Sequence, residues 1–193
     1  MQLKLFTIIC FLSAVAMAGL NPPLLIMGNG LMESEQLASF FMENNPDADE
    51  QRVVRLAALY IAECAFEGVN SDVAFVQMCL ETGFLRFQGL VSSEMNNFCG
   101  LGSVGPGQPG HSFPDECTGV RAHVQHLKAY GSSDPLNGDL VDPRFNYVTP
   151  RGKSPDIQGL AGAWATDRLY GDKLIDLLER LYQDYAAVQQ FNL

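Results

Sequence analysis

A short apolar helix with a carboxyl group in its last turn is the feature that most constrains this chain. Asn70 or Ser71 is suited to cap the start of this helix, and Gly83 is suited to end it. Its apolar residues recur at helical spacing: Val73, Val76 and Leu80. Glu81 therefore lies in the last turn of a helix that we expect to pack in the core.

The carboxyl group of Glu81 has two interpretations. Burial raises the pKa of a carboxyl group, and the partial negative charge at the C-terminal end of a helix acts in the same direction. A raised pKa is what a general acid needs near neutral pH. The alternative, which spacing alone favours, is that Glu81 simply leaves the helix end and enters water.

Residues 1–18 have the pattern of a secretory signal peptide. A single cation, Lys4, precedes an apolar run over residues 5–16, and small residues stand before the expected cleavage after Ala18. This run is shorter than the roughly 20 residues of a membrane-spanning helix, and no later run approaches that length. We expect an exported protein, periplasmic or extracellular, without stable membrane insertion.

Acidic residues outnumber basic ones along the chain. The sequence has 12 Lys and Arg against 22 Asp and Glu, a formal net charge of −10. Such a chain repels anionic polymers, which argues against a nucleic-acid partner. Any long acidic substrate would have to be held by local cations or neutral contacts.

No motif indicates a metal or a cofactor, so we expect none. The Gly-rich residues 100–110 lack the Gly-Lys-Ser/Thr ending of a phosphate-binding loop. His123 and His126 can share a helix face, but no acidic residue at matching spacing completes a ligand set. The cysteines outside the signal peptide are Cys64, Cys79, Cys99 and Cys117. They permit two disulfides in three pairings but match no zinc spacing, and we favour free buried thiols or one bridge.

The sequence predicts one α-rich domain over residues 51–193, preceded by a tether and a short helix over residues 19–50 that pack on it. Apolar stripes predict helices over residues 33–43, 116–130 and 167–188. A start signal with Asn45 as cap predicts a core helix that ends before Gly68. A second start signal at Ser154 predicts a short helix through Trp164.

One segment interrupts the helical pattern. Residues 100–114 contain too many Gly and Pro residues for a helix and predict loops with at most a short β-hairpin. This segment follows the helix that ends near Glu81. We therefore expect a mainly α domain with a small Gly/Pro-rich lobe, and a cleft between the two beside Glu81.

Four blocks of sequence resemble one known family. They are residues 77–83 (Gln-Met-Cys-Leu-Glu-Thr-Gly), 96–101 (Asn-Asn-Phe-Cys-Gly-Leu), 119–130 and 164–170 (Trp-Ala-Thr-Asp-Arg-Leu-Tyr). Together they resemble the bacterial endo-β-N-acetylglucosaminidases of glycoside hydrolase family 73, in the same order and over most of the chain. The resemblance implies a lysozyme-like fold and hydrolysis of the β-1,4 bond after N-acetylglucosamine in the glycan strands of peptidoglycan.

The resemblance also implies roles for individual residues. Glu81 takes the position of the catalytic acid, which protonates the oxygen of the glycosidic bond. Five residues take positions associated with substrate: Asn96, Asn97, Phe98, Trp164 and Tyr170. Cys99 stands where an aromatic residue is usual in the family, so stacking at that point is not expected.

The second catalytic group is less well defined by the sequence. The family takes a second carboxylate from the variable lobe, which here means Asp115 or Glu116. We favour Glu116, because Asp115 is suited to cap the helix that begins there. We therefore expect a protein carboxylate. The alternatives are that Glu116 is a first-turn acid with no catalytic role, and that the acetamido group of the substrate attacks in its place.

Two other functions are compatible with the same fold. One is a non-catalytic wall-binding or assembly module, and the other is a lytic transglycosylase, which releases an anhydro sugar. Hydrolysis by a monomer is the function that we expect.

Overall fold

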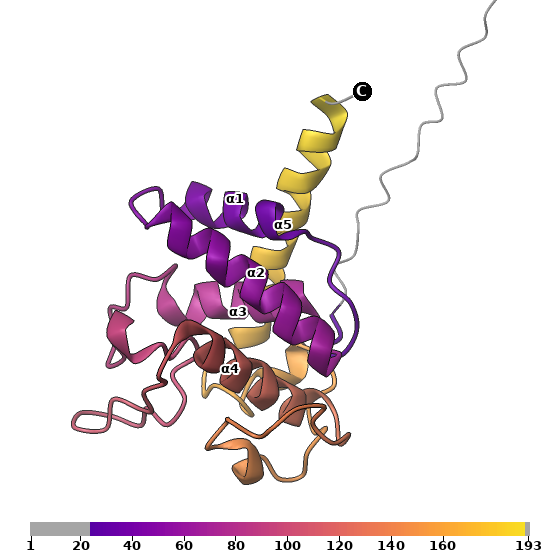
Figure 1. Ribbon diagram of the computed structural model, residues 1–193. Coiled ribbons are helices and arrows are strands. Elements are labelled where there is room, and N and C mark those ends of the chain that lie inside the picture. Colours follow the sequence, from indigo (N-terminus) through magenta and orange to yellow (C-terminus); the bar gives the residue numbers. More distant parts are fainter. Residues whose placement is uncertain (1–23, 192–193) are drawn as a thin grey trace, which may run out of the picture.

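The computed structural model describes residues 24–191, with side chains through residue 183 (Figure 1). This part of the chain forms five α-helices, three short 3-10 helices and no β-strand. The α-helices are α1 (Ser34–Asn44), α2 (Glu50–Glu67), α3 (Ser71–Thr82), α4 (Glu116–Gly131) and α5 (Tyr170–Phe191). The predicted mainly α class is confirmed. The predicted signal peptide, residues 1–18, lies outside the described residues.

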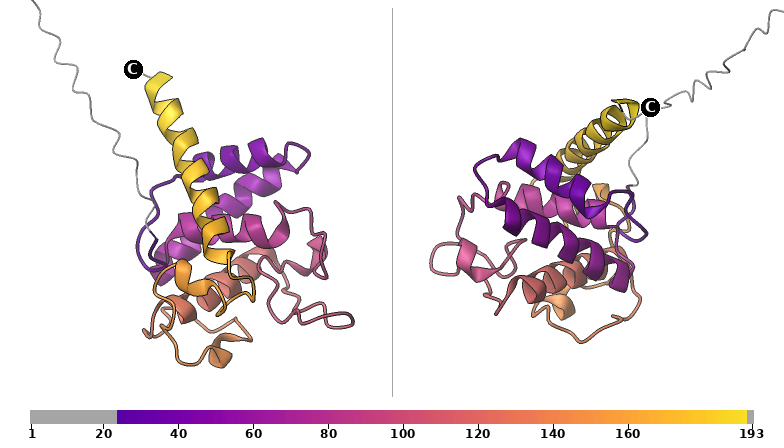
Figure 2. Two further views of the ribbon diagram at one scale, coloured as in Figure 1. Left: turned by 180° about the vertical axis from the view of Figure 1, so that it is seen from behind. Right: turned by 45° about the horizontal axis from the view of Figure 1, so that its top comes forward.

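Helix α3 lies at the centre of the molecule. The four other α-helices all pack against it, with α5 and α2 lying on different sides (Figures 1 and 2). Ten of its residues are buried, including the polar Asp72 and Gln77. A helix that is apolar on all sides is expected to be enclosed in this way. Because α3 is held from several directions, the position of its last turn, which carries Glu81, is fixed by the core.

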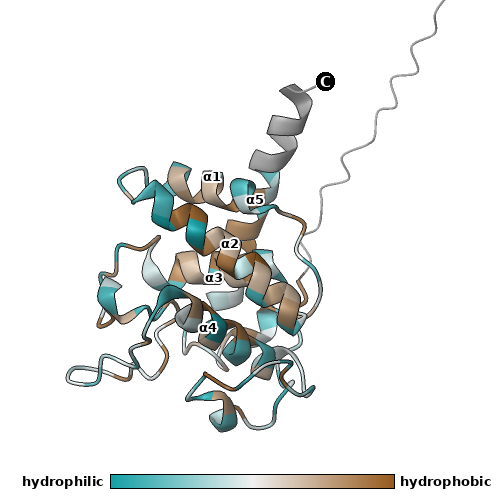
Figure 3. Ribbon diagram, in the orientation of Figure 1, coloured by the Kyte–Doolittle hydropathy of each residue, from teal (hydrophilic) through white to brown (hydrophobic). Residues whose placement is uncertain are grey.

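Helix α2 is amphipathic and covers one side of α3. Val53, Leu56, Tyr60 and Cys64 are buried along one face, while Glu50 and Arg55 are exposed. Figure 3 shows this change of character along α2 and α3, where hydrophobic colour gathers between the helices and hydrophilic colour lies at the outer turns.

The ends of α3 confirm the predicted capping residues. The side chain of Asn70 accepts hydrogen bonds from the backbone N–H groups of Asp72 and Val73. Gly83 ends the helix in the left-handed conformation, with φ 58°, which a residue without Cβ adopts at no steric cost. The chain therefore turns sharply just after Glu81.

Two predicted helix starts are corrected by the structure. Helix α2 begins at Glu50 with Asp49 as its N-cap, rather than near Asn45. Asn45 instead ends α1, because its backbone N–H bonds to Phe41 and its side chain donates to the carbonyl oxygen of Phe84.

The second correction concerns Ser154, where no α-helix begins. The backbone N–H of Ser154 bonds to the carbonyl oxygen of Tyr130, and its hydroxyl group donates to Gly159. The segment then forms only a 3-10 turn, Gln158–Leu160, before a turn at Gly162, where φ is 78°. These bonds tie the segment to the end of α4 and hold Trp164 in a loop.

The Gly/Pro-rich lobe is a loop, as predicted. Its only described ladder contact is an isolated antiparallel bridge between Gly105 and Gln108. At the other end of the chain, the segment before α1 lies against the core. Ile26 is fully buried, and the carboxylate of Asp72 accepts bonds from the backbone N–H groups of Leu31 and Met32. No helix among the described residues is both long and apolar enough to span a membrane.

Candidate active site

A pocket of about 350 Å³ lies at the C-terminal end of α3. Its walls come from the end of α3, from the loop after it, from the start of the Gly/Pro-rich lobe and from the loop that carries Trp164. The lining residues are Glu81, Thr82, Phe87, Gly89, Leu90, Val91, Asn97, Cys99, Gly100, Ser103, Trp164 and Ala165. Glu81 is the only carboxylic acid among them, and the predicted cleft beside Glu81 is present.

Glu81 is exposed to this pocket and bonded on its other side. The indole Nε1 of Trp164 donates to Glu81 Oε1 over 2.9 Å, and the hydroxyl group of Tyr170 donates to the same oxygen. No described residue donates to Oε2. One oxygen of the carboxyl group is therefore held by the protein, and the other is left for a ligand.

The pKa of Glu81 is raised above its usual value. Partial burial by the pocket walls is the largest cause, and the hydrogen bonds from Tyr170 and Trp164 act against it by stabilising the ionised form. The residue is thus neither deeply buried nor simply surrounded by water. The direction agrees with that expected for a carboxyl group at this helix end and suits a general acid.

Tyr170 is fixed by a second partner. It lies at the first turn of α5, is 5% exposed, and its hydroxyl oxygen accepts a hydrogen bond of 2.9 Å from Nε2 of Gln77. Gln77 and Glu81 are four residues apart on α3, so they lie on the same face of the helix. Sequence reasoning did not single out Gln77, although a polar residue inside an apolar helix was a usable signal.

Trp164 is held by a cluster of rings from α4. Its ring centroid lies 5.9 Å from that of His123, 5.0 Å from that of His126 and 5.2 Å from that of Tyr130. His126 is itself fixed by a 2.8 Å contact between its Nδ1 and Oδ2 of the buried Asp142. The two predicted residues Trp164 and Tyr170, six positions apart, therefore both reach Glu81, which lies more than 80 positions earlier in the chain.

The predicted residues Asn96 and Asn97 organise the lobe. The side chain of Asn97 is almost fully buried, donates to the carbonyl oxygens of Leu101 and His111, and accepts from the Leu101 N–H. Asn96 adopts the left-handed conformation and donates to the carbonyl oxygen of Phe113. Only Asn97 lines the pocket, and its side-chain amide is occupied by the backbone of the lobe.

Phe98 requires a correction. Its side chain has no exposed surface and packs in the main hydrophobic core. A ring in that position cannot contact a sugar, so Phe98 anchors the start of the lobe instead. The helix beneath accommodates this segment because Gly119 has no side chain: a Cβ there would stand 1.9 Å from the carbonyl oxygen of Asn96.

Asp115 and Glu116 both have structural partners at the start of α4. Asp115 is the N-cap, and its side chain accepts a 2.7 Å bond from the Thr118 N–H. Glu116 accepts a 2.7 Å hydrogen bond from Nε of Arg52 and lies 3.5 Å from Nε of Arg55. Neither acid is among the residues that line the Glu81 pocket.

The four cysteines of the described chain are all free thiols. Cys64, Cys79 and Cys99 are buried, and Cys117 is partly exposed. Cys99 lines the pocket, and burial raises the pKa of its thiol well above the usual value, which keeps it protonated and neutral. It therefore adds a small apolar surface to the pocket.

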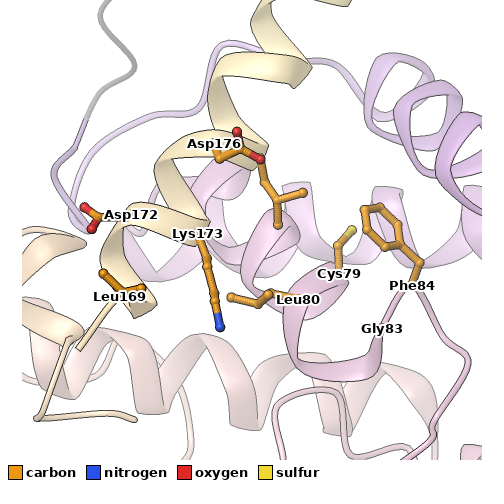
Figure 4. A pocket seen from close by; sticks show the side chains of 9 residues that line it. Cys79, Leu80, Gly83, Phe84, Leu169, Asp172, Lys173 and Asp176 are labelled. Carbon is orange, nitrogen blue, oxygen red and sulfur yellow. The ribbon is translucent and has the colours of Figure 1, made fainter. Parts of the chain in front are cut away.

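A second pocket, of about 440 Å³, lies between α3 and α5 and does not include Glu81 (Figure 4). Leu80, Cys79 and Phe84 form its apolar side, and α5 contributes Lys173, whose side chain extends beside Leu80. Nζ of Lys173 is paired with Asp167 at 2.6 Å. Asp172 and Asp176 also line this pocket, but it contains neither Glu81 nor the two donors that hold Glu81, Trp164 and Tyr170.

Comparison with known proteins agrees with these features. The family model described as mannosyl-glycoprotein endo-beta-N-acetylglucosaminidase matches residues 57–183. The match covers more than half of the chain, so the protein belongs to the glucosaminidase family, and the resemblance seen in the sequence is confirmed. The fold is accordingly a lysozyme-like helical domain, and membership of the family supports a glycan-hydrolase activity in general terms.

One curated relative is similar to most of the chain. An uncharacterized protein of Borreliella burgdorferi is 44% identical over 158 residues, which is 82% of this chain and 77% of the relative. No solved structure is significantly similar to the chain.

Proposed function

We propose that this protein hydrolyses the β-1,4 bond that follows N-acetylglucosamine in the glycan strands of peptidoglycan, with Glu81 as the general acid. The observation that carries the proposal is the asymmetric environment of the Glu81 carboxyl group. Oε1 accepts from Trp164 and Tyr170, while Oε2 has no partner among the described residues and the residue is exposed at the pocket.

The acid step follows from this arrangement. A glycosidic oxygen is a poor leaving group until it is protonated. The raised pKa of Glu81 favours its protonated form, and a proton on Oε2 faces the pocket. Transfer of that proton to the glycosidic oxygen lets the bond break and leaves Glu81 ionised, with Trp164 and Tyr170 stabilising the negative charge.

We further propose that the acetamido group of the substrate supplies the nucleophile. Glu81 is the only carboxylic acid among the described lining residues, and Asp115 and Glu116 serve as a helix cap and an ion-pair partner. The acetamido oxygen would attack the anomeric carbon as the leaving group departs, forming a cyclic oxazolinium ion. Ionised Glu81 would then take a proton from the water that reopens the ring.

Wall binding, cellular location and oligomeric state belong to the same proposal. The pattern of residues 1–18 supports an exported protein, periplasmic or extracellular. In this proposal the protein acts on the cell wall as a monomer. Peptidoglycan strands are the partner that the family assignment supports.

Product analysis tests the proposal. The purified mature protein, incubated with peptidoglycan, should release fragments with N-acetylglucosamine at the reducing end, and Glu81→Gln should release none. Anhydromuramic ends would show a lytic transglycosylase instead. Wall binding by the wild type without any released fragment would support the non-catalytic module.

A further inference from the structure

A chain of four hydrogen bonds runs through the core and ends on the Glu81 carboxyl group. The hydroxyl group of Tyr60 on α2 lies 2.8 Å from Nδ1 of His123 on α4. Nε2 of His123 lies 3.1 Å from Oε1 of Gln77, whose Nε2 lies 2.9 Å from the Tyr170 hydroxyl oxygen. Tyr60, His123 and Gln77 have no exposed surface. The glycan chemistry proposed above uses none of these three residues.

If each residue donates to the next one, from Tyr60 towards Glu81, every polar atom in this chain of hydrogen bonds is paired. Burial, and to a smaller extent the neighbouring His126, lowers the pKa of His123 to about 3, so its ring is neutral and carries one N–H. With that proton on Nε2, His123 donates to Gln77 and accepts from the Tyr60 hydroxyl group. Gln77 can then donate to Tyr170, whose hydroxyl group donates to Glu81.

The opposite direction leaves one buried donor unpaired and removes one hydrogen bond from Glu81. If His123 carried its proton on Nδ1 it would donate to Tyr60, and the hydroxyl proton of Tyr60 would have no acceptor among the described residues. Gln77 would present its oxygen to Tyr170, and the Tyr170 hydroxyl group would turn away from Glu81. An unpaired buried donor carries a full desolvation penalty, so the first direction is favoured.

We propose that Tyr60, His123 and Gln77 are positioning residues that fix the direction of the Tyr170 hydroxyl group and thereby hold the acidic proton of Glu81 on Oε2. This inference rests on the proposed role of Glu81 as the acid. Oε1 already accepts from Trp164 and Tyr170, and protonation of Oε1 would break one of these bonds or reverse the whole chain.

Few other ionisable groups act on this carboxyl group. Besides Tyr170 on α5, the group that interacts with Glu81 is the thiol of Cys99, which burial keeps neutral. Asp142 acts on Cys99, and His126 acts on His123 from the same helix. A change at Tyr60 is therefore transmitted to Glu81 through the hydrogen-bond chain rather than through a nearby charge.

The first test is a substitution of Tyr60, which stands at the end of the hydrogen-bond chain farthest from Glu81. Tyr60→Phe removes one hydroxyl group that lies four hydrogen bonds away from Glu81 and makes the two directions nearly equal. The pKa of Glu81, measured by carbon-13 NMR of its carboxyl group with Glu81→Gln for assignment, should rise by roughly half a unit, because polarisation along a chain strengthens each bond by about 10–30%. The alkaline limb of kcat should move upward by the same amount.

Tyr182→Phe is the matched control. It also removes one buried hydroxyl group, which here donates to Asp72 over 2.7 Å, and it leaves the chain to Glu81 intact. We expect a loss of stability in both variants and a shift of the Glu81 titration only in Tyr60→Phe. Equal titrations of Glu81 in the wild type and Tyr60→Phe would overturn the proposal, as would equal shifts in both variants.

A second test uses the wild-type protein, so it does not depend on whether a variant folds. Nitrogen-15 shifts of the His123 ring should show a neutral ring protonated on Nε2, and a proton on Nδ1 or a charged ring would overturn the proposal. Both NMR measurements read the protonation of residues rather than turnover. A protein without wall hydrolysis would refute the proposed function, whereas an Nε2 proton and a shifted Glu81 titration would still establish the chain.

Discussion

The two walls of the Glu81 pocket are built in different ways. On one side, Tyr60, Gln77, His123 and Tyr170 come from four helices and join in one buried series of hydrogen bonds. On the other side, the lobe is a loop whose backbone is gathered around the single side chain of Asn97. The acid is thus attached to the wall that the helices build, whereas the loop wall packs only in a small cluster in which Cys99, Leu101 and Phe113 meet Ala122 of α4. This difference suits a site that must fix a proton and still admit a polymer.

The largest effect on activity is expected from a substitution of Glu81, the acid on the helical wall of the pocket. Glu81→Gln keeps the shape of the side chain but cannot donate an acidic proton, so hydrolysis of peptidoglycan should fall by roughly 10²-fold or more. Thermal unfolding should be nearly unchanged, because the residue is exposed at the pocket. A variant that kept more than about a tenth of wild-type turnover would end the general-acid assignment.

The next largest effect is expected from a substitution in the loop wall, at Asn97. Asn97→Ala removes the side-chain partner of the Leu101 N–H and of the His111 carbonyl oxygen, which should lower the free energy of unfolding by roughly 2–3 kcal/mol. Hydrogen exchange should increase over residues 100–111, and turnover should fall because the pocket loses a wall. Denaturant titration and exchange measured by mass spectrometry check both effects.

The exposed Asn137 gives the control for that change. Its side chain donates to the carbonyl oxygen of Phe66 at the surface, where water can replace it. Asn137→Ala should cost less than about 1 kcal/mol and leave the lobe protected. If both variants behaved alike, the lobe would not depend on Asn97.

A smaller effect is expected from Trp164→Phe, which keeps a ring and removes one donor to Oε1. The bond from Trp164 lowers the pKa of Glu81, so its loss should raise that pKa further. Because the acid must be protonated, activity falls as pH rises through this pKa, and the alkaline limb of kcat should move to higher pH. Tyr147→Phe, at a surface site that is 71% exposed, should leave the limb in place. An unshifted limb in Trp164→Phe would remove the indole from the proposed role.

The sequence predicted those parts of the site that depend on local patterns. Helix α3, its caps and the position of Glu81 followed from local patterns, because apolar spacing, Asn70 and Gly83 act within a few residues. Trp164 and Tyr170 were found through their motif. Their meeting on one oxygen of Glu81 depends on tertiary packing, which spacing does not encode.

Other parts of the site depend on contacts between residues far apart in the sequence, which local patterns do not predict. For His123 the sequence analysis argued only against a metal site, but its hydrogen bonds to Tyr60 and Gln77 join residues at least 46 positions apart. Phe98 lay in a matching motif, yet its ring points into the core. A start signal at Asn45 failed because that side chain was already engaged by Phe84, 39 positions away.

The smallest effect is expected at the start of α4, and it decides between two mechanisms. In the double variant Asp115→Asn, Glu116→Gln, asparagine still caps the helix and the lost ion pairs with Arg52 and Arg55 are partly exposed. Stability should fall by about 1 kcal/mol or less. If the acetamido group of the substrate attacks, wall hydrolysis should remain within about twofold of wild type, and glycans that lack the N-acetyl group should not be cleaved. If Glu116 were the base, the double variant would be inactive, and azide would restore part of its activity by occupying the vacated site. The contrast between the walls would then need revision, because the loop side would supply a catalytic group.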